Sequence, residues 1–337
     1  MNAIMSLEKE KHYPVMLDQV LSIITPQHGG TFIDCTFGGG SYSRAILKYP
    51  GTKVIGIDRD KVTQTYANHL LKKYPKRFNF FKDKFSNIDK IIENNIKPKA
   101  IIFDLGLSSF QLNDEARAFS FESENILDME MGLNNYSAYD VINTLDKEHL
   151  TAIIKILGEE KDGRKIANKI DRCRKKEPIK TSKELASIIN SVKNRNKNYK
   201  KNPATKTFQA IRMFVNQELS ELILGLINAT SLLKDGGILV LVSFHSLEDK
   251  IIKNFFNLYS NFKSNPSRYL PLNEKKASLF KLISKKPLTP NEEEINENNP
   301  SRSAKLRYAV RSNDAFFYPD KFKNSFLHYF ELEEGKI

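Results

Sequence analysis

The chain has 337 residues, of which 40% are hydrophobic and 28% charged, enough apolar material for one large domain or two ordinary ones. No apolar run approaches the roughly 20 residues that span a bilayer, and residues 1–11 lack the apolar stretch of a secretory signal, so neither a membrane partner nor secretion is expected. The two cysteines, Cys35 and Cys173, are too few for a disulfide scaffold or a Cys-rich metal site, which favours the cytoplasm and predicts no metal.

The net charge of +13 favours a polyanionic partner, and its distribution strengthens this interpretation. Residues 155–212 contain 18 Lys and Arg against 6 Asp and Glu, a local net charge of +12. A compositional bias towards Lys would spread the charge more evenly along the chain. We therefore expect this segment to bind nucleic acid.

The first third of the chain alternates between predicted helices and predicted strands. A helix is expected over residues 15–24, and further helices over residues 41–48, 61–73 and 86–95. Short apolar strands are expected over residues 31–37, 54–57, 78–81 and 100–103. This alternation predicts an α/β fold with a doubly wound, mainly parallel sheet.

The alternation stops near residue 113 and returns near residue 238. Between them the signals are helical, with a capping box at Thr181 and Glu184, and one long helix or two abutting helices over residues 205–233. Strands are expected again over residues 238–244 and 306–310, and an acidic loop over residues 291–299. The prediction is an α/β domain of residues 1–112 and 215–337, interrupted by an all-α substrate-recognition domain of residues 113–214.

A glycine turn after the first predicted strand indicates a cofactor site. Gly38, Gly39 and Gly40 let the backbone approach a ligand, and Asp58 ends the next strand, where a carboxylate can accept both hydroxyls of an adenosine ribose. A nicotinamide dinucleotide would favour the spacing G-x-G-x-x-G, with a glycine where Ser43 stands. The contiguous glycines instead favour a cofactor without phosphates, such as S-adenosylmethionine.

Two other strand ends carry polar residues. Asp104 to Ser109 follow the strand predicted over residues 100–103, and Ser243 to Asp249, which include His245, follow the strand that begins at residue 238. The carboxyl ends of parallel strands are where open α/β sheets bind ligands. The alternative is a helix cap made by Asp104 or Ser108, or a histidine satisfied inside the core.

Several long motifs together resemble the bacterial 16S rRNA (cytosine-N4)-methyltransferase family. In chain order they are residues 12–17, 34–43, 104–109 with Gln111, 117–121, 127–129, 158–160, 203–218, 243–249 and 301–307. The resemblance implies a class I (Rossmann-like) methyltransferase domain with an inserted helical domain and S-adenosyl-L-methionine as methyl donor. The implied substrate is the N4 amine of a decoding-centre cytidine in 16S rRNA of the small ribosomal subunit.

The resemblance also implies roles for individual residues. The cofactor contacts would be Gly38, Gly40, Ser41, Tyr42, Asp58, Phe85, Asp104 and Gln111. We expect the groups that act on the target amine to be Ser108, Ser109 and His245. The expected RNA contacts are Arg117, Phe119, Phe121, Arg302, Lys305 and Arg307. Either a monomer or a homodimer is compatible with the sequence.

The chain departs from the family pattern at Ser41, where a glycine is usual, and at Glu130 and Gly132, where an arginine and an aspartate are usual. Two other functions stay open beside the rRNA enzyme. A DNA amino methyltransferase would share the cofactor site, although the chain lacks the Asp/Asn-Pro-Pro-Tyr motif of many such enzymes. A non-catalytic RNA-binding assembly factor would be expected to have lost cofactor residues such as Asp58, Asp104 and Gln111, which are present.

Overall fold

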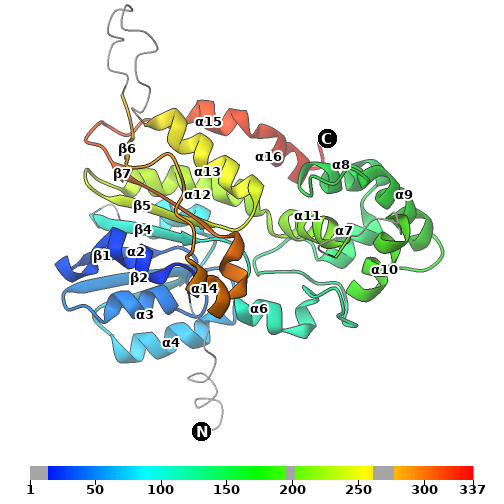
Figure 1. The fold of residues 1–337 in the computed structure, drawn as a ribbon, viewed down its shortest axis with the longest axis horizontal. Coiled ribbons are helices and arrows are strands. Elements are labelled where there is room, and N and C mark those ends of the chain that lie inside the picture. Colours follow the sequence, from blue (N-terminus) through cyan, green and yellow to red (C-terminus); the bar gives the residue numbers. More distant parts are fainter. Residues whose placement is uncertain (1–13, 94, 194–201, 261–276, 337) are drawn as a thin grey trace, which may run out of the picture. The chain divides into compact units, whose positions relative to one another are not determined.

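The computed structural model describes residues 14–93, 95–193, 202–260 and 277–336 (Figure 1). The chain divides into two compact units, one of Met1–Gly106 and Leu222–Phe322, the other of Leu107–Glu221 and Lys323–Ile337. The sequence-based division differs at the C-terminus, because it assigned all of residues 215–337 to the α/β domain. Within the described residues, no helix is both long and apolar enough to cross a membrane.

The first unit is built on a seven-stranded sheet with the order β3-β2-β1-β4-β5-β7-β6. Its strands are β1 (Gly30–Asp34), β2 (Thr52–Asp58), β3 (Phe78–Lys82), β4 (Pro98–Asp104), β5 (Ile238–Ser243), β6 (Phe280–Leu282) and β7 (Lys305–Arg311). The first five strands run parallel, whereas β7 is antiparallel to both β5 and β6. The predicted α/β class and doubly wound sheet are therefore confirmed, and the short strand β6 was not predicted.

Four helices accompany the sheet as the alternating pattern predicted: α2 (Leu17–Ile24), α3 (Ser41–Leu47), α4 (Thr63–Lys73) and α5 (Ile88–Ile91). Helices α13 (Ser246–Tyr259) and α14 (Glu292–Glu297) belong to the same unit and were not predicted. Figure 1 shows α3 and α4 beside β2 and β3, and α13 packs on β5, β6 and β7. Phe32, Val54, Ile102 and Val240 carry the core across four neighbouring strands and are buried.

The second unit is helical. It contains α6 (Ser109–Asn113), α7 (Ala138–Thr144), α8 (Lys147–Ile156), α9 (Gly163–Arg174), α10 (Ser182–Val192), α11 (Thr205–Asn216) and α16 (Leu327–Glu333). Helices α12 (Glu218–Leu232) and α15 (Asp320–Ser325) cross the division between the units. The capping box predicted at Thr181 and Glu184 is present and begins α10.

The long helical stretch of residues 205–233 is two abutting helices. Gln217 separates α11 from α12 with a left-handed φ of 53°. Arg212 and Glu218 bridge this turn with two parallel hydrogen bonds of 2.8 Å, a bidentate ion pair between the last turn of α11 and the first residue of α12. Leucine and isoleucine spacing continues across the turn, so periodicity alone does not reveal the break.

The loop predicted over residues 291–299 was wrong, because Glu292–Glu297 form helix α14. The side chain of Asn291 caps it by accepting the backbone N–H of Glu294 at 2.8 Å. The glutamates that suggested a solvated loop fill the first turn, where negative charge is favourable to the helix dipole. An asparagine followed by acids is a helix-start signal that the sequence interpretation missed.

Candidate active site

Three aspartates lie at the same edge of the sheet. Asp34, Asp58 and Asp104 end the adjacent parallel strands β1, β2 and β4. The sheet order reverses between β1 and β4, so Asp34 and Asp104 flank the switch point where open α/β sheets bind ligands. The hydroxyl of Thr36, two residues after β1, accepts the backbone N–H of Asp104 at 2.7 Å and ties the two strand ends together.

The glycine turn is joined to Asp58 by a hydrogen bond. The N–H of Gly38 donates to the Asp58 carboxylate at 2.7 Å, and the N–H of Asp60 donates to its other oxygen at 2.9 Å. Each carboxylate oxygen can accept a further bond, so Asp58 keeps acceptor capacity for a diol. A side chain added at Gly39 would meet no atom within 4 Å, so there is open space beside the turn.

The serine that departs from the family pattern fits without strain. Gly38 and Gly40 have positive φ values of 53° and 76°, whereas Ser41 begins helix α3 and is absent from the positive-φ residues. The turn therefore needs glycine at 38 and 40 but not at 41. The replacement at Ser41 leaves the cofactor turn intact.

The three aspartates form an acidic edge, in which Asp34 is buried and Asp58 and Asp104 are partly buried. Burial raises the pKa of Asp58 to about 7 and that of Asp34 to about 6, against the hydrogen bonds that each carboxylate accepts. Burial, and then the charges of Asp34, Glu248 and Glu294, raise the pKa of Asp104 well above its usual range. One oxygen of Asp34 and one of Asp104 are buried with no hydrogen-bond partner among the described residues. A site of this kind favours a ligand that brings positive charge and hydrogen-bond donors.

Helix α14 and the start of α2 border the same site. The Glu294 carboxylate accepts the N–H of Met16 at 2.6 Å, and the hydroxyl of buried Tyr42 donates to the carbonyl of Val15. The pKa of Tyr42 is raised well above its usual range by burial and then by the charges of Asp104, Asp34 and Glu294. Tyr42, predicted to contact the cofactor, thus links α3 to the segment before α2.

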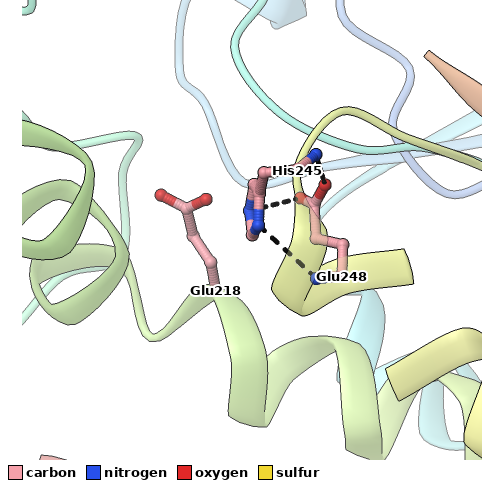
Figure 2. A group of neighbouring side chains, drawn as sticks. All are labelled: Glu218, His245 and Glu248. Atoms are coloured by element: carbon pink, nitrogen blue, oxygen red, sulfur yellow. Dashed lines mark hydrogen bonds and ion pairs between the residues drawn. The ribbon is translucent and has the colours of Figure 1, made fainter. Parts of the chain in front are cut away.

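His245 caps helix α13, a role that the sequence analysis considered for Asp104 and Ser108 but not for this histidine. Its Nδ1 accepts the N–H of Glu248 at 3.4 Å, while its Nε2 lies 3.2 Å from the buried Glu248 carboxylate (Figure 2). The other oxygen of that carboxylate accepts the N–H groups of Phe244 and His245. The Nδ1 atom therefore serves as the acceptor that caps α13.

Two of the predicted RNA contacts hold the first unit together. Lys305 and Arg307 donate to the Asp249 carboxylate at 2.9 and 2.7 Å, and Arg307 is buried. These ion pairs join β7 to the first turn of α13, and they lower the pKa of Asp249 although burial opposes the shift. Arg302, in contrast, is exposed. Of these three cations, Arg302 is the one best placed to meet a phosphate.

Phe85, predicted to contact the cofactor, packs edge-on against Phe103 with ring centroids 5.3 Å apart and is only partly buried. A side chain added at Gly225 would meet the Phe85 ring at 2.7 Å, so this helix glycine makes room for the phenylalanine. The ring therefore has one packed face and some exposed surface.

The other predicted site residues belong to the second unit. Ser108 caps α6, and its Oγ and the Gln111 side chain form a reciprocal capping box; Ser109 is the first residue of that helix. Arg117 is buried and paired with Asp114 at 3.2 Å. Phe121 packs edge-on against Phe208 at 4.8 Å, which favours a core role for this ring, and Phe119 is partly buried.

Sequence reasoning missed several residues of this region. Asp34 stood inside the glycine motif, but nothing in the sequence indicates that one of its oxygens is buried and unpaired. Glu248, Asp249 and Glu294 act through contacts with residues that lie far away in the chain or across a turn. A capping-box pattern of His245 with Glu248 was the one available signal.

The sheet order, the antiparallel β7 and the acidic edge beside a glycine turn define a class I methyltransferase. The chain belongs to the MraW methylase family, whose sequence profile matches residues 9–312, and it is an S-adenosylmethionine-dependent methyltransferase.

Curated relatives match almost end to end and are named "Ribosomal RNA small subunit methyltransferase H". That of Ehrlichia ruminantium is 45% identical over 305 residues, covering 89% of this chain and 99% of the relative. That of Afipia carboxidovorans is 42% identical over 313 residues, covering 92% and 93%. That of a Wolbachia strain from Drosophila simulans is 43% identical over 303 residues, covering 89% and 99%.

The residues present fit S-adenosylmethionine. The unpaired buried oxygens of Asp34 and Asp104 suit its ammonium and sulfonium charges, and Asp58 suits its ribose hydroxyls. The open space at Gly39 suits a ligand that lies along the turn.

Proposed function

We propose that this chain transfers a methyl group from S-adenosylmethionine to the N4 amine of a decoding-centre cytidine in 16S rRNA. The observation that carries the proposal is the acidic edge, with oxygens of Asp34 and Asp104 that lack partners within the described residues. The names of the relatives support ribosomal RNA of the small subunit as substrate. The motif resemblance supports cytosine N4 as the acceptor atom.

The cofactor, when bound, supplies a methyl group made electrophilic by the sulfonium charge. Asp58 would hold the ribose, and Asp104 with Asp34 would balance the cationic end, while Gly38 and Gly40 keep the turn in the left-handed conformation that leaves space beside Gly39. The motif resemblance adds Ser41, Tyr42, Phe85 and Gln111 to the proposed cofactor contacts.

The acceptor amine sets the remaining demands. Its lone pair is delocalised into the cytosine ring, which makes the nitrogen a poor nucleophile. The enzyme must therefore hold the nitrogen in line with the methyl group. Such positioning can lower the activation barrier by roughly several kcal/mol. The nitrogen sheds a proton as it gains the methyl group, and a nearby acceptor assists. We place Ser108, Ser109 and His245 in this role, since all three follow strand ends of the α/β sheet in the chain.

The residues that we propose to contact the RNA substrate are Arg117, Phe119, Phe121, Arg302, Lys305 and Arg307. Arg302 is exposed, whereas the guanidinium of Arg307 is committed to Asp249. We therefore rank Arg302 above Arg307 as a phosphate contact. Phe119, which is partly buried, would stack on an unstacked base, as base-modifying enzymes require of their targets, whereas the ring of Phe121 already packs against Phe208.

The decisive experiment is mass mapping of methylated cytidine in small-subunit rRNA from cells with and without this protein. The proposal expects one N4-methylated cytidine to disappear from the decoding centre when the protein is absent. In parallel, purified protein is offered tritiated S-adenosylmethionine with small subunits or with DNA. Label in DNA alone would favour the DNA amino methyltransferase, and label in neither would favour a non-catalytic assembly factor.

A further inference from the structure

Helix α9 presents a row of cations on its outer side. Ile166, Ala167 and Ile170 are buried on its inner side, whereas Arg164, Lys169 and Arg172 are exposed. Five exposed cations on α9 and its flanks form no ion pair within the described residues: Lys161, Arg164, Lys169, Arg172 and Lys176.

Three other cations of α9 and its C-cap are engaged, and the first, Lys165, pairs with Asp162 at 3.6 Å. Arg174 is mostly buried, donating to Asp171 at 3.0 Å and to the carbonyl of Ile142 at 2.8 Å, so it anchors the helix. Lys175 pairs with the same Asp171 at 2.8 Å. Arg174 therefore stabilises the helix from within the unit, and the five exposed cations are the ones available to a ligand.

The neighbouring helix α10 offers an instructive contrast. The cations at its N-terminal end are exposed too, but Lys180 pairs with Glu177 at 3.2 Å and Lys183 pairs with Glu124 at 2.6 Å. Lys206, at the start of α11, donates to the carbonyl of Glu159 at 2.9 Å. The excess positive charge in the described part of the basic segment is therefore concentrated on α9.

The position of α9 is fixed by a buried ion pair at its N-terminus. Lys193, which follows α10, lies 2.6 Å from Glu160 and 3.4 Å from Asp162, and both Lys193 and Glu160 are buried. Glu160 also accepts the N–H of Asp162 at 3.0 Å. A helix held in this way presents its charges at fixed spacing, which lowers the entropy lost when they meet a regular polyanion.

We propose that the outer face of α9, carried by Arg164, Lys169 and Arg172, docks the phosphate backbone of the RNA substrate. This inference rests on the proposed function for the identity of the polyanion. Phosphate contacts position a nucleic acid without reading its sequence, so α9 would add affinity and orientation but no base specificity. The cofactor-binding residues of the first unit take no part in it.

The test compares two triple variants with the same change in net charge. The first is Arg164→Gln, Lys169→Gln and Arg172→Gln, and the second, a matched control, is Lys180→Gln, Lys183→Gln and Lys206→Gln. Glutamine has nearly the helix propensity of lysine and arginine, so both proteins are expected to fold, and thermal unfolding verifies it. Binding to in-vitro-transcribed small-subunit rRNA is measured by fluorescence anisotropy over a range of salt concentrations.

Each lost phosphate contact flattens the log–log salt dependence by roughly 0.7–0.9 units, so the α9 variant should lose about two units of slope and the control much less. Its KM for RNA should rise at low salt while kcat at saturating RNA and the affinity for S-adenosylmethionine stay at wild-type values. A wild-type slope in the α9 variant, or equal losses in both variants, would overturn the proposal. Failure of the wild-type protein to methylate rRNA would instead overturn the proposed function, since the binding measurement needs no transfer.

Discussion

The acidic edge of the first unit and the basic face of α9 hold charge in opposite ways. Asp34, Asp58 and Asp104 are few, burial raises the pKa of each, and the charge of Asp34 adds to the rise at Asp58 and Asp104. The α9 cations are exposed and more numerous than the three aspartates. Both regions suit a ligand of opposite charge, but the acidic edge suits one small cation and the basic face suits an extended polyanion.

The difference lies in how solvent treats each charge. In a buried site of low dielectric, one small cation changes the energy of several carboxylates, so recognition is strong and depends on pH. On an exposed face, water and salt screen each charge, so many contacts are needed and recognition depends on ionic strength. The comparison predicts that pH should act on cofactor binding and salt on RNA binding.

The largest effect should come from the acidic edge. Asp58→Ala removes two charge-assisted hydrogen bonds to the ribose, each on the order of 1.5–3 kcal/mol, and should weaken S-adenosylmethionine binding by about two to four orders of magnitude. Calorimetric titration measures the dissociation constant for S-adenosylmethionine in both proteins. Asp18→Ala, which removes an exposed acid from α2, is the control for charge alone and should bind normally. A folded Asp58→Ala protein with wild-type affinity would remove this residue from the site.

A second prediction concerns the buried ion pair of Lys193 with Glu160 at the N-terminus of α9. Glu160→Gln leaves the buried Lys193 ammonium with the longer 3.4 Å contact to the part-exposed Asp162, and should destabilise the protein by about 3–5 kcal/mol in chemical denaturation. High salt should restore little of the loss, because buried charges are poorly screened.

The double variant Glu160→Gln with Lys193→Met is the control for this pair, since it removes the stranded charge and should recover most of the stability. A loss below 1 kcal/mol in the single variant would show that this pair behaves like a solvated one. In that case, this ion pair would not account for the fixed position of α9.

The sequence predicted the strands that carry the acidic edge because buried strands leave short apolar runs with a polar residue at the end, as at Asp58 and Asp104. It could not predict what those residues touch. Lys305 and Arg307 look like RNA contacts in the sequence, yet Asp249, which is 56 residues from Lys305, pairs with both. Arg174 lies in the basic segment, yet its guanidinium donates to the carbonyl of Ile142 on α7. Pairing across the fold, and not composition, separates structural cations from available ones.

Cofactor affinity should also depend on pH. Since burial raises the pKa of Asp34 to about 6 and of Asp58 to about 7, both carboxyls bind protons in the ligand-free protein as the pH falls below neutrality. Protonation removes the negative charge that favours the ligand, so affinity should fall as the pH drops from about 8 to about 5.5, by at most tenfold per pH unit and per proton.

Calorimetry across this range, with S-adenosylhomocysteine as comparison, tests the pH dependence. The thioether carries no sulfonium charge, so its affinity should change less with pH than that of the methyl donor. Equal and flat profiles for both ligands would contradict an acidic edge that titrates near neutrality.

The smallest expected effect is at His245, where two variants test whether the ring takes part in methyl transfer or only caps α13. Since the imidazole Nδ1 accepts the N–H of Glu248, His245→Ala should destabilise α13 by about 1 kcal/mol, whereas His245→Asn, a good cap, should keep the stability. If the ring also acts on the target amine, turnover should fall about tenfold in both variants with cofactor affinity intact. Single-turnover methyl transfer and thermal unfolding, measured on both proteins, resolve the two roles. Wild-type turnover in His245→Asn would mean that His245 serves α13 alone, and the proton acceptor would then be sought at Ser108 and Ser109.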